Sequence, residues 1–156
     1  MEYQQHKILV LICSVLLFTT VLWGCSELTD DKFSSLWDKS FSSCALNCHS
    51  PGGTADEGPD LSSKDQFHSN LINKTANDYP DWTRGSDCDD IKFINPGNAN
   101  TSTVAASLIQ SLSDSLIASG SCTATSYNIH LTNSATITDA SLQTEITEWI
   151  NGGAKK

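Results

Sequence analysis

The sequence predicts an all-α domain with long loops. Four segments carry apolar residues at helical spacing, whereas no segment alternates apolar and polar residues as a half-buried strand does. Proline and glycine punctuate the polar stretches between these segments. With 156 residues, 38% of them hydrophobic and 17% charged, the chain has the length and composition of one globular domain.

The first helix is predicted from one apolar stripe at helical spacing, which consists of Phe33, Leu36, Trp37, Phe41 and Cys44. The helix brings Cys44 and Cys48 to its end, one turn apart and on the same face. Ser50-Pro51-Gly52-Gly53 then breaks it. We therefore expect both cysteines where the first helix runs into a loop.

The second helix is expected to be short and to start near Ser63 or Lys64. Phe67 and Leu71 share its buried face. Residues 75–100 show no period and contain several proline and glycine residues. A stretch of that length inside a small domain is typical of a functional loop.

The Asn95-Pro96-Gly97-Asn98 segment is predicted to form a tight turn, because proline fixes φ at one position and glycine allows positive φ at the next. A third helix follows, with Thr101 or Ser102 as its N-cap and an end at Gly120. Its buried face consists of Val104, Leu108, Ile109, Leu112 and Leu116.

The last helix has the clearest pattern. Thr138 or Asp139 caps its start, and Gly152-Gly153 ends it. Its apolar stripe consists of Leu142, Ile146, Trp149 and Ile150. We expect Trp37 and Trp149 to pack in the core between the first and the last helix.

An apolar run near the N-terminus, residues 8–23, follows Lys7 and has the length of a signal-peptide core. It ends in Leu22-Trp23-Gly24-Cys25, which resembles the lipobox of bacterial lipoproteins. A simple secretory signal and an uncleaved anchor are the alternatives.

The lipobox resemblance implies a signal peptide over residues 1–24 and a lipid on Cys25 that anchors the protein to a membrane. Residues 25–32 would then form a lipidated tether. Ser26, where an aspartate would favour retention in the inner membrane, implies sorting to the outer membrane, facing the periplasm.

The chain is acidic, with a net charge of −9, and removal of residues 1–24 would leave this charge unchanged. Because it has no basic patch, the sequence gives no sign of nucleic-acid binding, and its acidity favours a basic partner. Export would place the protein in an oxidising compartment, where free thiols persist poorly. We therefore expect four cysteines to be bridged, bound to a cofactor or otherwise protected: Cys44, Cys48, Cys88 and Cys122.

The stretch that bears most directly on function is Cys44-Ala45-Leu46-Asn47-Cys48-His49. Covalent haem attachment normally uses Cys-x-x-Cys-His, in which both cysteines form thioether bonds and the histidine binds the iron. Here the same residue types occur with one extra residue between the cysteines. On a helix the two cysteines still share a face, so both sulfurs could reach one porphyrin.

The order of several motifs resembles that of small class I c-type cytochromes, in particular the monohaem cytochrome c-like domains of bacterial exported proteins and lipoproteins. The haem motif precedes Asp60-Leu61-Ser62, then Pro96-Gly97-Asn98 with Ser102 behind it, and finally residues 149–154. This resemblance implies a cytochrome c-like domain over residues 33–156. It also implies one covalent haem c and single-electron transfer to an unidentified redox partner, without enzymatic activity.

By the same resemblance, Cys44 and Cys48 hold the haem, His49 is the proximal ligand, and Cys88 forms a disulfide with Cys122. Such domains often place one cysteine before the Pro-Gly turn and another after the helix that follows it. A disulfide closing a loop of that size would contribute about 3–4 kcal/mol to the free energy of unfolding.

The second axial ligand departs from the usual His/Met pair, because Met1 is the only methionine. His130 lies where the related domains carry the methionine, and it is the expected distal ligand. His68 is the competing candidate, and both histidines also have a plain interpretation as surface residues. An open sixth site would instead favour binding of a gas or a peroxide.

The main alternative is a haem-free lipoprotein of the same fold, a structural or interaction module in which Cys44 and Cys48 bridge each other or pair with Cys88 and Cys122. A thiol oxidoreductase would need Cys-x-x-Cys at the start of a helix after a strand. A zinc site using the motif with a distant fourth ligand is another alternative. Residues 87–90 contain three aspartates, which could bind calcium but fit a solvated acidic turn better.

Overall fold

The computed structural model describes residues 30–53, 58–81, 88–120 and 136–156, without the side chains of Asp30, Asp31, Cys44, Leu46 and Asn47. More than half of the described residues are helical, and none of them lies in a β-strand. The predicted all-α class is confirmed. In chain order the larger elements are α2 (Asp30–Leu36), η1 (Trp37–Phe41), α3 (Ser42–Asn47), α4 (Lys64–Leu71), α5 (Thr103–Leu108), α6 (Gln110–Ala118) and α8 (Ala140–Asn151).

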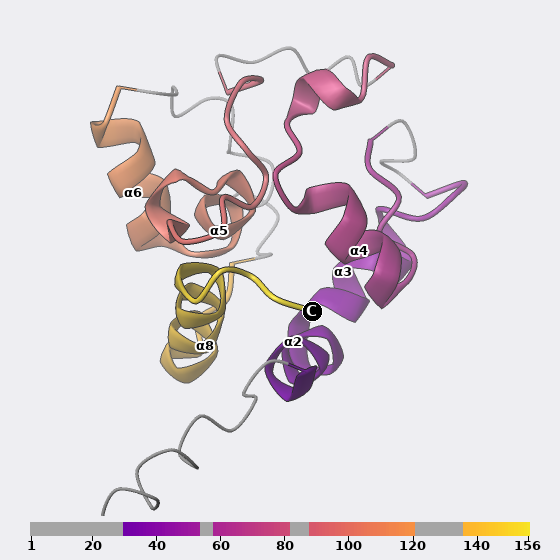
Figure 1. Ribbon diagram of the computed structural model, residues 1–156, viewed down its shortest axis with the longest axis horizontal. Helices are drawn as coiled ribbons and strands as arrows, with labels where there is room; N and C mark the ends of the chain where they lie inside the picture. The colour runs from indigo at the N-terminus through magenta and orange to yellow at the C-terminus, as the bar shows by residue number, and fades with distance from the viewer. Residues whose placement is uncertain (1–29, 54–57, 82–87, 121–135) are drawn as a thin grey trace, which may run out of the picture.

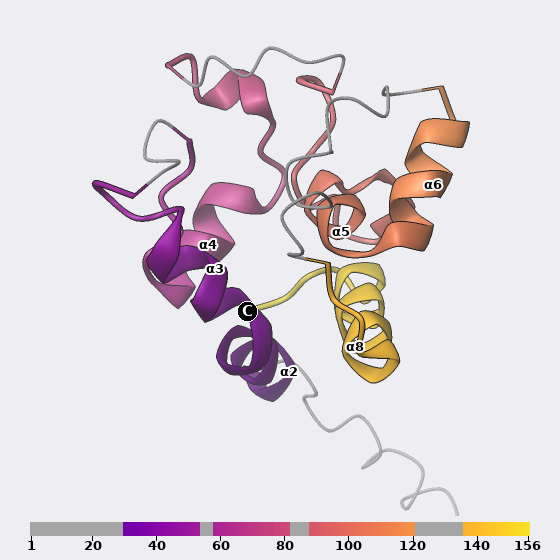
Figure 2. The same ribbon diagram turned by 180° about the vertical axis from the view of Figure 1, so that it is seen from behind.

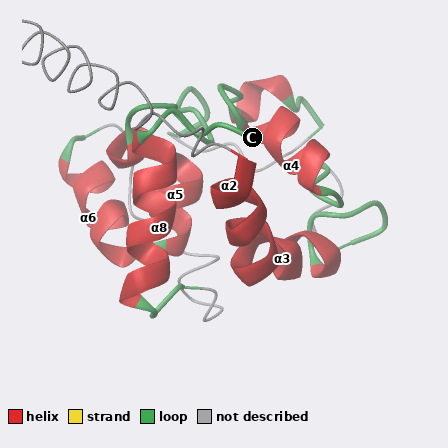
Figure 3. Ribbon diagram, turned by 60° about the horizontal axis from the view of Figure 1, so that its bottom comes forward, coloured by secondary structure: helices red, strands yellow, loops and turns green. Residues whose placement is uncertain are grey.

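The helices divide into two groups, as Figures 1 and 2 show from opposite sides. One group contains α5, α6 and α8, and the other contains α2, α3 and α4, with the C-terminal segment running between them. Loops make up most of the remaining described chain (Figure 3). Within the described part of the chain, no helix has the length and apolar character needed to cross a membrane.

The predicted first helix is a continuous helical segment formed by α2, η1 and α3, with a wide turn in its middle. In η1 the backbone hydrogen bond from Ser42 to Trp37 spans five residues instead of four. Because of this extra residue, Leu36 and Phe41 are both buried although they are five positions apart.

The wide turn changes the spacing of the predicted apolar stripe. After Phe41, Ala45 is fully shielded from solvent, whereas the side chain of Cys44, the last residue of the predicted stripe, lies outside the described ones. The helix also begins at Asp30, inside the predicted tether of residues 25–32. A regular period could not predict the added residue, because the wide turn depends on which side chains the core buries.

The last helix, α8, has the form that the sequence predicted. The carboxylate of Asp139 accepts hydrogen bonds from two backbone N–H groups of the first turn, at 2.8 and 3.1 Å. Of the predicted stripe, Ile146, Trp149 and Ile150 are buried and Leu142 is partly buried against the core, and Gly152 ends the helix. Uninterrupted periodicity therefore predicted the face that α8 turns to the core.

A cluster of aromatic rings joins the first helical segment to α8 and α4. The rings of Phe33 and Trp149 stack with centroids 5.1 Å apart, and those of Phe41 and Phe67 stack at 4.4 Å. Trp37 meets Phe67 edge-on at 5.7 Å. The predicted packing of Trp149 between the first and last helices is confirmed, whereas Trp37 is only partly buried at the edge of the cluster.

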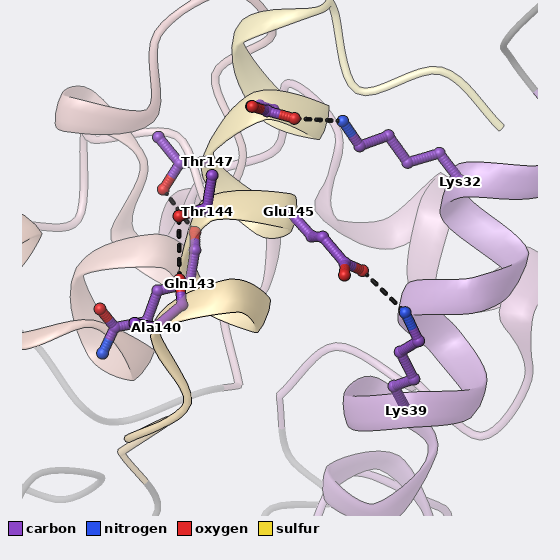
Figure 4. A network of polar contacts seen from close by, with 8 residues as sticks. Lys32, Lys39, Ala140, Gln143, Thr144, Glu145 and Thr147 are labelled. Carbon is purple, nitrogen blue, oxygen red and sulfur yellow. Dashed lines mark hydrogen bonds and ion pairs between the residues drawn. The ribbon is translucent and has the colours of Figure 1, made fainter.

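Two ion pairs cross the surface of the same helix contact (Figure 4). The ammonium of Lys32 lies 2.8 Å from the carboxylate of Glu148, and that of Lys39 lies 2.9 Å from Glu145. Exposed pairs of this kind typically contribute less than about 1 kcal/mol. The buried aromatic rings must therefore provide most of the stability of this contact.

The second helix, α4, begins where the sequence predicted. The hydroxyl of Ser63 accepts a hydrogen bond from a backbone N–H of the first turn at 3.2 Å, so Ser63 is the N-cap. Phe67 and Leu71 are buried, as expected from their spacing. This helix positions one side of the candidate site.

The long stretch after α4 is tied back to that helix. Ile72 and Ile94 form an isolated parallel bridge, and a short helix, η2 (Ala76–Asp78), lies between them in sequence. The hydroxyl of Tyr79 donates to the carbonyl oxygen of Asn70 at 2.9 Å. Partial burial, followed by the negative charge of Asp78, raises the pKa of Tyr79 above its ordinary value.

The predicted Asn95-Pro96-Gly97-Asn98 turn is confirmed, with φ of +90° at Gly97. It is fastened to the end of α8. The N–H of Gly97 donates to the carbonyl oxygen of Ile150 at 2.8 Å, and the N–H of Ala99 donates to the side-chain oxygen of Asn151 at 2.9 Å. Ala99 opens the short helix η3 (Ala99–Thr101).

The third predicted helix is divided into α5 and α6 at Ile109, and Val104 of its predicted buried face is only partly buried. Ile109 has an extended backbone, and the carbonyl of Leu108 before it accepts a hydrogen bond from Ile137 at 2.9 Å. A segment distant in sequence therefore donates a hydrogen bond to the backbone carbonyl at the break. Ser102 precedes α5 as predicted, but its hydroxyl braces the Pro-Gly turn through Asn95 and Asn98 instead of capping the helix.

Candidate functional site

The Cys-x-x-x-Cys-His segment lies where the first helical segment ends. Cys44 belongs to α3, and Cys48 is the first residue after that helix. The thiol of Cys48 is exposed and forms no disulfide. His49 is half-buried, and its ring nitrogen Nδ1 is buried.

The loop after His49 closes tightly over the motif. The N–H of Gly53 donates to the carbonyl oxygen of Ser50 at 2.8 Å. A Cβ atom at position 53 would lie 2.6 Å from the carbonyl oxygen of Cys48 and 2.9 Å from that of Ser50. Because backbone atoms form both contacts, only glycine fits at this position without a shift of the loop.

The backbone of His49 is held by Leu61. The N–H of Leu61 donates to the carbonyl oxygen of His49 at 2.7 Å. The Leu61 side chain is buried, and Pro59 before it is fully buried. The segment after the loop is therefore packed firmly against the residue that follows Cys48.

Asp60 fixes this segment to α4. One carboxylate oxygen accepts from the N–H of Ser62 at 2.9 Å, and the other accepts from the side-chain amide of Gln66 at 2.7 Å. The backbone carbonyl of Asp60 accepts from the side-chain amide of Asn70, also at 2.7 Å. Gln66 in turn accepts from the hydroxyl of Ser62 at 2.7 Å.

His68, the competing distal candidate, has a structural contact. Its Nε2 atom lies 2.9 Å from the carbonyl oxygen of Ala154, and its ring packs edge-on against Phe33 with centroids 5.4 Å apart. The nitrogen that would bind iron is thus engaged with the C-terminal segment. This contact favours the plain interpretation of His68 over a role as ligand.

Two further contacts hold the same C-terminal segment. The indole N–H of Trp149 donates to the carbonyl oxygen of Lys155 at 2.7 Å. The ammonium of Lys156 lies 2.6 Å from the carboxylate of Asp65 on α4, and this hydrogen bond lowers the pKa of Asp65. The C-terminal residues therefore link α8 to α4.

Cys88 is disulfide-bonded. It packs with Ala106 and Leu116 in a small cluster of its own, on the side of the molecule that contains α5 and α6. Its partner belongs to the cysteines whose side chains lie outside the description. Cys122 follows the end of α6 closely in sequence, whereas Cys44 lies in α3 in the other group of helices. The location of Cys88 therefore favours the predicted Cys88–Cys122 pairing, which stays a prediction.

Several predicted site residues lie outside the described residues: Cys25, Cys122, His130, Trp82 and Asp87. The signal peptide over residues 1–24 lies outside them too. Among the residues that are described, no group of three or more His, Cys, Asp or Glu side chains is placed to hold a metal ion. In the acidic turn, Asp90 accepts a hydrogen bond from Asn77 at 2.7 Å.

The described part of the motif fits a covalently attached haem. Attachment requires a reduced, accessible thiol, and Cys48 provides one. It also requires a histidine directly after that cysteine, and His49 sits partly buried at the helix end. The backbone of His49 is held by the N–H of Leu61, a contact that does not involve the Cys48 thiol.

The sequence indicated the motif but not the residues that support it. Gly53 was expected only to break the helix, and Asp60 and Leu61 had a place in a motif order without a physical role. The one local signal is the Asp60-Leu61-Ser62 order, in which the aspartate side chain can accept a hydrogen bond from the backbone N–H two residues later. The contacts to Gln66 and Asn70 depend on how α4 packs.

Comparison of the chain with models of protein families, with curated proteins and with solved structures found no match.

Proposed function

We propose that this protein is a membrane-anchored, c-type haem protein that transfers single electrons in the cell envelope and catalyses no reaction of its own. The proposal rests on the order of motifs in the sequence and on the state of the cysteines in the fold. Haem c at this site would supply a one-electron couple between ferric and ferrous iron.

The observation that carries the proposal is the contrast between two cysteines. Cys88 is disulfide-bonded, whereas Cys48 is exposed and unbridged directly before a histidine. In an exported protein an exposed free thiol is exceptional, because the compartment oxidises it. Thioether attachment to haem would explain why this thiol is kept out of a disulfide. This contrast also argues against the alternative in which Cys44 and Cys48 bridge each other.

Each motif residue has a separate role in this proposal. Cys44 and Cys48 would hold the porphyrin, and His49 would bind the iron as the proximal ligand. Because Nδ1 of His49 is buried, the ring would bind iron through its other nitrogen, Nε2. The apolar helix faces would provide surroundings of low dielectric, which tune the potential.

The proposed distal ligand is His130. Met1 is the only methionine of the chain, and Nε2 of His68 is hydrogen-bonded to the carbonyl oxygen of Ala154. A pair of histidines would give six-coordinate iron at a lower potential than a His/Met pair. The proposed anchor is a lipid on Cys25, which would hold the domain at the outer membrane, facing the periplasm. The partner would be a redox protein with a basic docking face.

The test is the intact mass and the visible spectrum of the protein, expressed as the full chain in bacteria that have the c-type maturation system. After denaturation, a mass increase of one haem with a retained Soret band is expected. A polypeptide with two disulfides and no haem would overturn the proposal and favour the haem-free module.

Variants then assign the ligands. His49→Ala should abolish the low-spin spectrum, and Cys48→Ala should reduce covalent attachment. His130→Ala should convert six-coordinate iron to five-coordinate iron, whereas His68→Ala, the matched control, should leave the spectrum unchanged. Loss of the low-spin spectrum in His68→Ala alone would transfer the distal role to His68.

A further inference from the structure

Asp60 directly precedes Leu61, the residue whose N–H holds the backbone of His49. Both oxygens of its carboxylate and its backbone carbonyl accept hydrogen bonds, at 2.7 to 2.9 Å, and two of the three donors are side chains of α4. The next residue, Leu61, donates its N–H to the carbonyl oxygen of His49 at 2.7 Å. Asp60 therefore connects α4 to the segment that holds His49, the candidate ligand.

The helix that holds Asp60 is itself fixed in the core. Phe67 lies on α4 between Gln66 and Asn70 in sequence, is 3% exposed, and stacks on Phe41 at 4.4 Å. Phe41 belongs to the helical segment that leads to Cys48. One aromatic contact therefore joins the helical segment that leads to His49 and the helix that holds the Asp60 segment.

We propose that Asp60 is a positioning residue for His49. It holds the Leu61 N–H against the His49 carbonyl and so fixes the backbone of the residue that follows Cys48. Without the Asp60 carboxylate, Leu61 would keep its buried side chain, but the segment would lose the two hydrogen bonds, from Ser62 and Gln66, that orient the Leu61 N–H. The relevance for haem rests on the proposed function, whereas the backbone contact itself does not.

The first experiment needs no haem. The protein is produced from the full chain in cells without the c-type maturation system, and amide hydrogen exchange is measured by NMR. Asp60→Ala should accelerate exchange of the Leu61 amide about tenfold beyond any change in global unfolding, because the local contact opens more often. The ring signals of His49 should shift, and those of His68 should not.

The matched control is Asp139→Ala. Asp139 also accepts two hydrogen bonds through its side chain, but both come from the first turn of α8, which it caps. Asp139→Ala should lower global stability without selective acceleration at Leu61. Equal acceleration at Leu61 in both variants would overturn the proposal, since Asp60 would then be only one more stabilising residue.

A milder pair of variants covers the case in which Asp60→Ala does not fold. Gln66→Ala removes one of the two α4 side chains that donate to Asp60, and Asp60→Asn keeps the shape of the side chain. Gln66→Ala should accelerate the Leu61 amide selectively, and Asp60→Asn should do so less than Gln66→Ala. Exchange at wild-type rates in Gln66→Ala would contradict the positioning role.

The second experiment uses haem-loaded protein and separates the two proposals. If wild-type protein attaches haem, Asp60→Ala should change the midpoint potential or the ligand-sensitive spectrum, and Asp139→Ala should not. If wild-type protein attaches no haem, the proposed function fails. The exchange data on Leu61 would still decide whether Asp60 positions His49.

Discussion

The first and the last helices of this domain pack against each other, yet they meet the core in different ways. In α8 the buried residues follow one regular period from Ile146 to Ile150, and a single aspartate caps the start. In the first helical segment the buried face continues only because the wide turn η1 adds one residue between Leu36 and Phe41. Regular spacing thus describes a helix well until the core requires a different register.

The difference predicts opposite responses to the loss of one residue. Deletion of Thr144 from α8 should rotate all later residues by about 100° and turn Trp149 and Ile150 out of the core. We expect loss of more than about 5 kcal/mol, enough to prevent folding. Deletion of the exposed Asp38 from η1 should instead convert the wide turn into a regular one.

After that second deletion Leu36 and Phe41 would be four positions apart and would still share a face. The free energy of unfolding should change by only about 1 kcal/mol. Chemical denaturation followed by circular dichroism measures both variants. A severe loss on deletion of Asp38 would show that the wide turn has a role beyond absorbing one residue.

The aromatic contact between the two helices gives the next largest expected effect. Phe33 is fully buried and stacks on Trp149, so Phe33→Ala should cost about 3–5 kcal/mol. Trp37, on the same helical segment, is only partly buried. Trp37→Ala should therefore cost clearly less in the same denaturation experiment. Similar losses in both variants would mean that the Phe33–Trp149 stack is not the main contact.

The smallest expected effect concerns Asp65, which links α4 to the C-terminal residues. The hydrogen bond and charge of Lys156 lower the pKa of Asp65 below its ordinary value of 3.8. A lowered pKa stabilises the fold above the ordinary value, and this contribution is lost as the pH falls through the folded value. Lys156→Ala should raise the pKa of Asp65 toward 3.8, as followed by NMR titration.

Asp78 provides the local control for that titration. Its pKa is lowered first by the backbone N–H of Thr75 and then by Lys74, both within the same turn. Lys156→Ala should leave the pKa of Asp78 unchanged. A parallel shift at Asp78 would indicate a general change of charge instead of loss of a specific contact.

The candidate site, like the helices, has some features that the sequence predicted and some that it did not. The location of Cys48 and His49 at a helix end followed from the apolar stripe and the glycines behind it. The Leu61 to His49 hydrogen bond did not follow, because it joins segments whose approach depends on the packing of α4. The bond from Ile137 to Leu108, which divides the third predicted helix, escaped the sequence for the same reason.

The sequence by itself determined the all-α class, the start of α4 near Ser63, the cap of α8 at Thr138 or Asp139, the Pro-Gly turn and most of the buried face of α8. These features depend on residues within a few positions of each other, where propensity and periodicity act. Only the tertiary structure decided the wide turn at η1, the break at Ile109 and the contacts around Asp60. The break at Ile109 and the contact with His49 each pair a backbone group with another segment, and the wide turn depends on which rings the core buries. Propensity and periodicity within a few residues do not predict such pairings.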